Sequence, residues 1–127
     1  MLDKKYIASR ISRSKETMAE AKLMFDNQHY LTVINRLYYA VFYLACAYLA
    51  NIQIITKTHS GTKIQFNEAF IKTRIVDEAF GKLYSKLFKD RNDNDYGDFV
   101  ALQKDEVLDL LIETDGLLNK YWAKFYN

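Results

Sequence analysis

The chain has 127 residues, of which 50% are hydrophobic, and this is enough for one domain with a full core. Its formal net charge of +2 excludes the strongly basic surface typical of nucleic-acid-binding proteins. Proline is absent and glycine occurs only 4 times, which excludes a turn-rich sandwich or barrel and predicts long helices with few connections.

The single cysteine, Cys46, excludes an internal disulfide framework and is typical of a reducing compartment, so we expect a cytoplasmic protein. The opening "MLDKKYIASRISRSK" is basic like a transit peptide, but Asp3 and Glu16 interrupt the basic character, and we expect no targeting segment. The longest uncharged apolar run, residues 37–50, is shorter than the roughly 20 residues that a membrane span needs. We therefore expect no membrane association.

The first two predicted helices cover residues 3–26 and 30–50. The first has one apolar face with alternating spacings of four and three residues. That face comprises Ile7, Ile11, Ser14, Met18, Ala21 and Phe25. The second, "YLTVINRLYYAVFYLACAYLA", is apolar nearly all round, which is typical of a helix in the middle of a bundle or at a subunit interface.

A loop then leads to a short third helix, for which Thr58 or Ser60 is a suitable N-cap. This helix carries Phe66, Phe70 and Ile71. The fourth predicted helix covers residues 76–91 and has its stripe at Phe80, Leu83, Tyr84, Leu87 and Phe88. The fifth covers residues 103–125, with Val107, Leu111, Thr114, Leu118, Tyr121 and Phe125 in register. The pattern predicts an all-α protein, a single domain over residues 1–127, folded as an antiparallel four-helix up-and-down bundle with a short extra helix.

The stretch "KDRNDNDYGDF", residues 89–99, follows the fourth stripe directly. Continuing that stripe turns Arg91 inward, where a permanent charge needs an anionic partner. One interpretation is an internal pair between Arg91 and Asp95, with Gly97 ending the helix. The other is an anion pocket in which Arg91 faces a phosphate and Tyr96 lies beside it. A calcium loop is excluded by spacing, because the terminal Glu position would be Gln103.

His59, in "KTHSG", is the second candidate site residue, although a lone histidine near a helix start is more often structural. Lys63, Lys72 and Arg74 add positive charge near the third helix; they also fit its solvated face. No His, Cys or Asp cluster has metal-ligand spacing, so we expect no metal and no cofactor.

Four segments in order, "NRLYYAVFY", "KTHSGTKIQF", "FIKT" and "FGKLYSKLFKDRNDNDYGDF", resemble the HEPN domain family, in its short stand-alone prokaryotic branch. The likeness covers roughly residues 9–124. It implies a helical bundle that is commonly dimeric, binds nucleotide or RNA, and is often encoded beside a minimal nucleotidyltransferase. Many such proteins are ribonucleases, and several are toxins that the transferase neutralises.

The family's ribonuclease motif is an Arg followed, after four to six residues, by His. Arg91 matches the Arg, but Tyr96, Gly97 and Asp98 occupy the positions of the His, so the usual general acid or base is absent. His59 is a possible substitute from another helix. Some partner transferases modify a Tyr two residues after the motif His, and this role does not carry over to Tyr96.

Three functions remain open: a nucleotide- or RNA-binding module with its pocket at Arg91, Asp95, Tyr96 and His59; a metal-independent ribonuclease toxin; and a purely structural bundle. The missing motif His favours the first over the second. Because helix 30–50 is apolar in every direction, we also expect a homodimer with Tyr39, Phe42 or Tyr43 at or near its interface. The nucleotidyltransferase is an expected protein partner.

Overall fold

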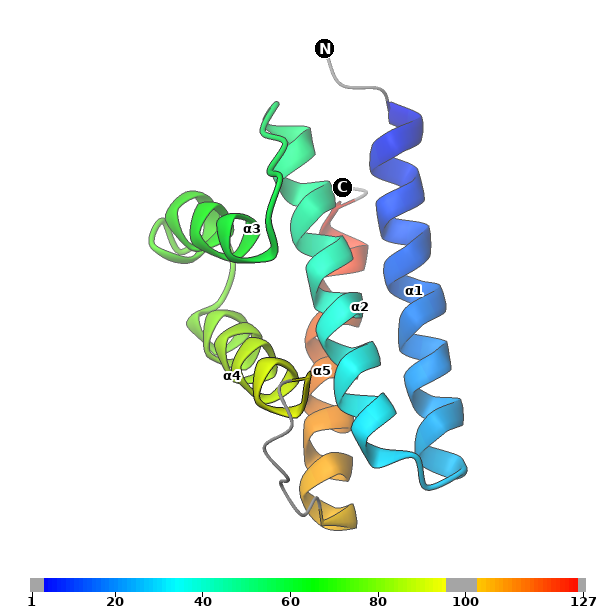
Figure 1. Cartoon of the computed structure of the whole chain (residues 1–127). Helices are drawn as coiled ribbons and strands as arrows, with labels where there is room; N and C mark the ends of the chain where they lie inside the picture. The colour runs from blue at the N-terminus through cyan, green and yellow to red at the C-terminus, as the bar shows by residue number, and fades with distance from the viewer. Residues whose placement is uncertain (1–3, 96–102, 126–127) are drawn as a thin grey trace.

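The computed structural model describes residues 4–95 and 103–125, and these residues are almost entirely helical. The elements are α1 (Lys4–Asp26), α2 (Tyr30–Asn51), α3 (His59–Phe66), the π-helical segment η1 (Asn67–Ile71), α4 (Glu78–Asp95) and α5 (Lys104–Phe125). The described residues contain no strand, so the all-α bundle predicted from the sequence is confirmed. In Figure 1, α1, α2 and α5 stand side by side, and α3 and α4 lie on the other side of α2 from α1.

Helix α2 is the centre of the bundle, because it packs against α1, α3, α4 and α5. By length and composition alone it could also cross a membrane, but 67% of that apolar segment is buried inside the structure. The apolar residues of α2 thus form a protein core, as the sequence predicts for a helix that is hydrophobic on most of its circumference. Cys46 of this helix is half-buried, and burial raises the pKa of its thiol to about 11.

The apolar stripes of the other long helices form the rest of the core. All predicted stripe residues of α1 are buried except Phe25, which packs against the core. On α4, Phe88 is likewise half-buried while the four other stripe residues are buried. On α5, the predicted stripe residues between positions 107 and 121 are buried, and the side chain of Phe125 lies outside the described part of the chain.

A buried polar contact joins three helices. Ser14 of α1 donates a hydrogen bond to the Ala40 carbonyl of α2 at 2.6 Å, and the Trp122 indole N–H of α5 donates to the Ser14 hydroxyl at 3.0 Å. Because both donors are buried, this contact satisfies groups that would otherwise have lost their hydrogen bonds to water.

Two predicted boundaries are wrong. The fourth helix begins at Glu78 rather than residue 76, and it ends at Asp95 rather than Arg91. Asn and Asp disfavour a helix interior only mildly, and no Pro or Gly lies between Arg91 and Asp95, so the helix continues through them.

The chain after α3 stays helical through Ile71, in agreement with the predicted third helix that carries Phe66, Phe70 and Ile71. It continues as the π-helical turn η1, and Ile71 at the end of that turn packs closely over Gly81 of α4. A Cβ added at Gly81 would lie 3.1 Å from the Ile71 Cγ2 atom. This glycine inside α4 therefore allows a close approach between the two elements.

Three helical segments are followed by a residue in the left-handed conformation that favours glycine. These residues are Gln28 with φ 64°, Gln53 with φ 67° and Arg74 with φ 62°. A chain with so few glycines therefore ends its helices with side-chain-bearing residues, which carry some backbone strain.

Candidate functional site

Arg91 lies on α4, one helical turn before its end, and is half-buried against α2. Its guanidinium carbon is 5.0 Å from the ring centroid of Tyr38 and 5.3 Å from that of Tyr39. One terminal nitrogen donates a hydrogen bond to the Tyr39 hydroxyl at 3.3 Å. The side chain of Arg91 therefore points inward, as the α4 stripe predicts.

His59 reaches the same tyrosines from the first position of α3. The start of this helix is fixed by Thr58, whose side chain accepts a hydrogen bond from the Gly61 backbone N–H at 2.9 Å. A Cβ at Gly61 would lie 2.7 Å from the Thr58 Oγ1 atom, so glycine leaves room for this cap. The cap fixes the orientation of the turn that carries His59.

The His59 ring is packed among aromatic rings of α2. Its Nδ1 atom is 2.9 Å from the Tyr38 hydroxyl, and its centroid lies 5.6 Å from Tyr39 and 4.6 Å from Phe42. Arg91, His59, Tyr38, Tyr39 and Phe42 thus form one cluster, which we call the Arg91–His59 site.

Burial and charge set the protonation of this site. Burial, and next the positive charge of Arg91, lower the pKa of His59 below its usual 6.5, so the imidazole is neutral at pH 7. Burial raises the pKa of the Tyr38 hydroxyl, with Arg91 opposing the rise. At neutral pH the site therefore places one permanent cation beside a neutral imidazole and the neutral phenol of Tyr38.

These groups can perform anion recognition and base stacking. A guanidinium has five N–H donors in one plane, which suits a phosphate, and two neutral groups, the Tyr39 hydroxyl and the Asn92 side-chain oxygen, accept hydrogen bonds from Arg91. Tyrosine and phenylalanine rings stack on nucleobases, and of the rings in this site Tyr39 and Phe42 are half-exposed whereas Tyr38 is fully buried. Among the described residues, no group of three or more His, Cys, Asp or Glu side chains could hold a metal ion.

The structure brings together two of the four residues predicted for the site, Arg91 and His59. Asp95 ends α4 one turn after Arg91, but its side chain lies outside the described part of the chain, as does Tyr96. Tyr38 was missed as a site residue. Its position four residues before Phe42, on the same helix face, is the signal in the sequence that could have identified it.

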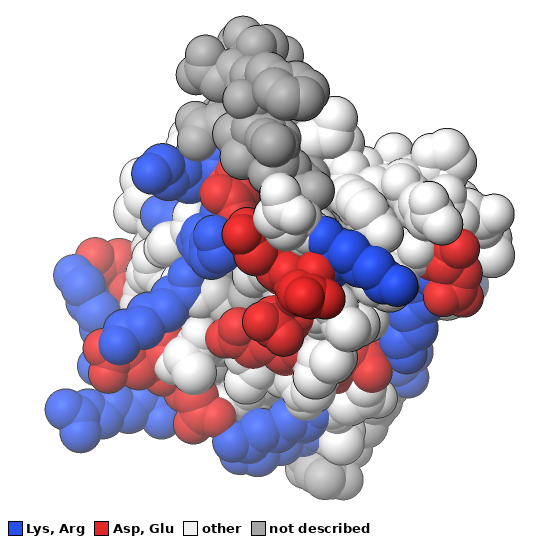
Figure 2. Space-filling view, turned by 90° about the horizontal axis from the view of Figure 1, so that it is seen from below, with Lys and Arg blue, Asp and Glu red and all other residues white. Residues whose placement is uncertain are grey.

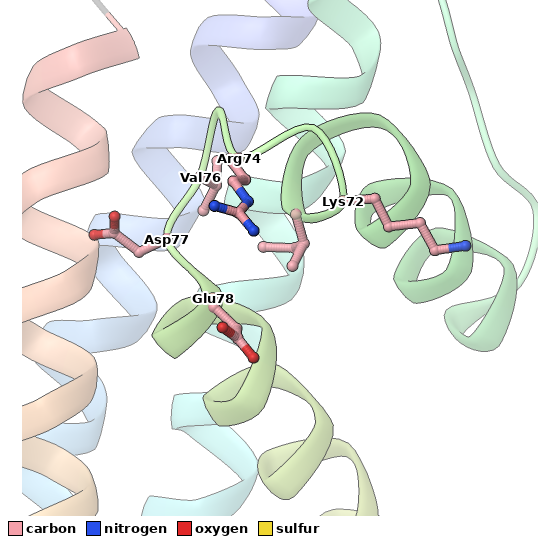
Figure 3. Close-up of a pocket in the computed structure, with 6 residues that line it drawn as sticks. Lys72, Arg74, Val76, Asp77 and Glu78 are labelled. Atoms are coloured by element: carbon pink, nitrogen blue, oxygen red, sulfur yellow. The ribbon is translucent and has the colours of Figure 1, made fainter.

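A separate pocket of about 550 Å³ lies at the other end of α4, between that end and η1 (Figure 3). It is lined by Ile71, Lys72, Arg74, Val76, Asp77 and Glu78. Lys72 pairs with Glu68 and Asp77 pairs with Lys120, so much of the charge in its wall is neutralised locally. The lining of this pocket lacks the aromatic rings of the Arg91–His59 site.

The lower end of the molecule carries mixed charge. Figure 2 shows a group of acidic side chains there, with Lys and Arg side chains around it. The first turn of α5, which begins at this end in Figure 1, contains Asp105 and Glu106. This face is thus not uniformly basic, in keeping with the small net charge.

The molecule is an all-α bundle in which Arg91 of α4 and His59 of α3 meet on the aromatic side chains of the central helix α2. Residues 7–122 match the HEPN domain family, and the chain belongs to that family.

Several known sequences resemble the chain over most of its length. The chain is 35% identical to a "UPF0332 protein" of Thermotoga maritima over 84% of this chain and 81% of that protein. It is 26% identical to "Putative toxin MJ0142" of Methanocaldococcus jannaschii over 92% of this chain and 80% of that protein. A second protein of that organism, "Putative toxin MJ0605", is 30% identical over 71% of this chain and 67% of the relative.

Proposed function

We propose that the chain is a toxin-type HEPN module that binds the phosphate of a nucleotide or RNA at the Arg91–His59 site. The observation that carries this proposal is the placement of Arg91: a permanent cation, held against two tyrosine rings, beside an imidazole from a different helix. The names of two relatives support the toxin class. The Asp95 carboxylate and Tyr96 belong to the proposed pocket as neighbours of Arg91 in the sequence.

Ribonuclease activity is the second candidate, and the position of His59 favours it. One ring nitrogen of His59 is engaged with the Tyr38 hydroxyl, and its environment keeps the imidazole neutral, which is the form that accepts a proton. Arg91 beside it would stabilise the charge on a pentacoordinate phosphorus. If the chain is a ribonuclease, His59 takes the general acid or base role of the missing motif His.

One experiment separates the two candidates. Purified protein in EDTA is titrated with fluorescent RNA and with nucleotides, and the same RNA is analysed on a gel after incubation. Binding without cleavage supports the binding module, and cleavage that is lost in His59→Ala supports the ribonuclease. The absence of both in the wild type would leave only the structural bundle.

Two protein partners are also proposed, a second copy of the chain and a nucleotidyltransferase. We propose a homodimer whose interface lies beside the half-exposed stripe of Tyr39, Phe42 and Tyr43 along α2 and leaves the arginine-flanked side of these rings accessible. We also propose a minimal nucleotidyltransferase partner and a cytoplasmic location. Light scattering at micromolar concentration tests the dimer, since a monomer mass would contradict it. Co-purification with a nucleotidyltransferase encoded next to this gene tests the other partner.

A further inference from the structure

Further arginines, besides Arg91, lie against the half-exposed tyrosines of α2. The Arg36 guanidinium carbon lies 5.3 Å from the Tyr39 ring centroid, on the same ring that Arg91 contacts. One turn further along α2, the Tyr43 ring centroid is 6.0 Å from that of Tyr39. Guanidinium groups and tyrosine rings therefore lie together along this face.

Helix α1 continues the same pattern. The guanidinium carbons of Arg10 and Arg13 lie 5.1 Å and 5.3 Å from the Tyr43 ring centroid. We call Arg36, Tyr39, Tyr43, Arg10 and Arg13 the arginine–tyrosine row. It joins the Arg91–His59 site at Tyr39 and runs from there across α2 to α1.

The row has an excess of positive charge. Arg13 pairs with Glu16 at 3.1 Å and Arg36 pairs with Glu20 at 3.2 Å, and both glutamates are substantially exposed. Arg10 lies near the rings of Tyr6 and Tyr43 and has no carboxylate partner among the described residues. Arg10 at the far end of the row and Arg91 in the site that the row joins are both positive, so cations flank the tyrosine rings on both sides.

We propose that the arginine–tyrosine row binds the strand of a single-stranded RNA that extends away from a phosphate held at Arg91. This inference rests on the proposed function and names the ligand more narrowly. Cations separated by tyrosine rings match phosphates spaced along a chain, whereas a mononucleotide carries its phosphates in one compact group. Bases stack on guanidinium planes and on aromatic rings, and the row presents both.

The test uses fluorescein-labelled oligouridines of three and twelve nucleotides, with anisotropy measured at several salt concentrations. We expect the wild type to bind the 12-mer at least about tenfold more tightly than the 3-mer, because a longer strand meets more cations and rings. Arg10→Gln/Arg13→Gln is expected to bind the 3-mer with the affinity of the wild type. It should lose most of the additional affinity for the 12-mer. Its slope of log affinity against log salt should fall by about 1.4, because each phosphate contact to a single strand contributes roughly 0.7.

Two further variants keep the test interpretable. Lys72→Gln/Lys82→Gln removes the same charge from exposed residues that are not part of the row, and it should keep the length dependence. If the double Arg variant does not fold, Arg13→Gln alone, at a partly exposed position, should lower the salt slope by about 0.7.

The possible failures are distinguishable. No binding of the 3-mer by the wild type would contradict the phosphate site at Arg91 and thus the proposed function. Two results would contradict RNA binding by the row but not the phosphate site at Arg91. One is equal affinity of the wild type for the 3-mer and the 12-mer, and the other is a higher affinity for the 12-mer that persists in Arg10→Gln/Arg13→Gln. A nucleoside triphosphate that binds as tightly as the 12-mer, with the same dependence on Arg10 and Arg13, would contradict the proposal that the row binds a single-stranded RNA. A fall to monomer mass in the double variant would show that the row is instead an interface between copies.

Discussion

Arg91 and His59 lie against the same two tyrosine rings although they come from different helices. The ring centroid of Tyr38 is 5.0 Å from the Arg91 guanidinium carbon and 5.8 Å from the His59 ring centroid, and Tyr39 is similarly close to both. The α3 cap at Thr58 fixes one side of this arrangement and the inward face of α4 fixes the other. A cation and a titratable imidazole are thus held together by aromatic packing.

His59 should titrate below pH 6.5. Because its pKa is lowered in the folded protein, the folded state binds fewer protons than the unfolded state between that pKa and 6.5. The contribution of His59 to stability is therefore fully present above pH 6.5 and is lost as the pH falls through the folded pKa. NMR titration of the His59 ring protons measures the pKa directly. Arg91→Ala should raise it, and an unchanged or lower value would contradict the electrostatic influence of Arg91.

Tyr38→Phe should cost about 1 kcal/mol of unfolding free energy, because it removes the hydrogen bond to His59 Nδ1 and keeps the ring. Urea denaturation measures the loss. Tyr30→Phe is the matched control on the same helix, where the ring packs on Phe25 and the change should cost almost nothing. Equal costs for the two changes would show that the Tyr38 hydroxyl contributes nothing specific.

Ser14→Ala should destabilise the fold by about 1–3 kcal/mol, because it leaves the buried Trp122 N–H without its acceptor. Ser12→Ala, at an exposed position two residues away on the same helix, should change the unfolding free energy by less than about 0.5 kcal/mol. Denaturation followed by Trp122 fluorescence compares the two. A cost at Ser14 no larger than that at Ser12 would argue against the three-helix contact.

Gln28→Gly should stabilise the protein by roughly 0.5–1 kcal/mol. Gln28 has φ 64°, where a side chain is strained and glycine is not, and the greater freedom of glycine in the unfolded chain offsets part of the gain. Thermal melts detect the change.

The control for this prediction is the neighbouring change Asn27→Gly. Asn27 is not among the residues with positive φ, and its side chain donates a hydrogen bond to the Leu23 carbonyl at 2.8 Å, so the change should destabilise. Destabilisation by Gln28→Gly as well would mean that the glutamine side chain contributes more than its strain costs.

The sequence predicted the helices well because α1, α4 and α5 each have one apolar face with a clear period, and α2 is one long apolar segment. The end of α4 was misplaced, since Asn and Asp after Arg91 resemble a turn but fit a helix. The inward direction of Arg91 followed from spacing alone. Tyr38 could not be assigned to the site, because a helix that is apolar nearly all round gives no indication of which ring faces which neighbour.

The positive charge of the α2 face was also hidden in the sequence. Arg10, Arg36 and Arg91 belong to three different helices, and the net charge of +2 averages them with acidic residues elsewhere. Only packing brings them to the neighbouring rings of Tyr39 and Tyr43. The net charge of the whole chain therefore gave no sign that these arginines lie together.

The central claim is that Arg91 serves a ligand rather than the fold, and RNA binding by Arg91→Ala tests it most directly. Anisotropy titration with a short RNA is combined with a thermal melt of each protein, and Arg91→Lys is included because it keeps the charge and loses the planar donors. We predict that Arg91→Ala loses binding with only a modest fall in melting temperature, and that Arg91→Lys is intermediate. Wild-type protein that binds no RNA or nucleotide, together with a loss of roughly 3 kcal/mol or more in Arg91→Ala, would contradict the claim and assign Arg91 to an internal ion pair.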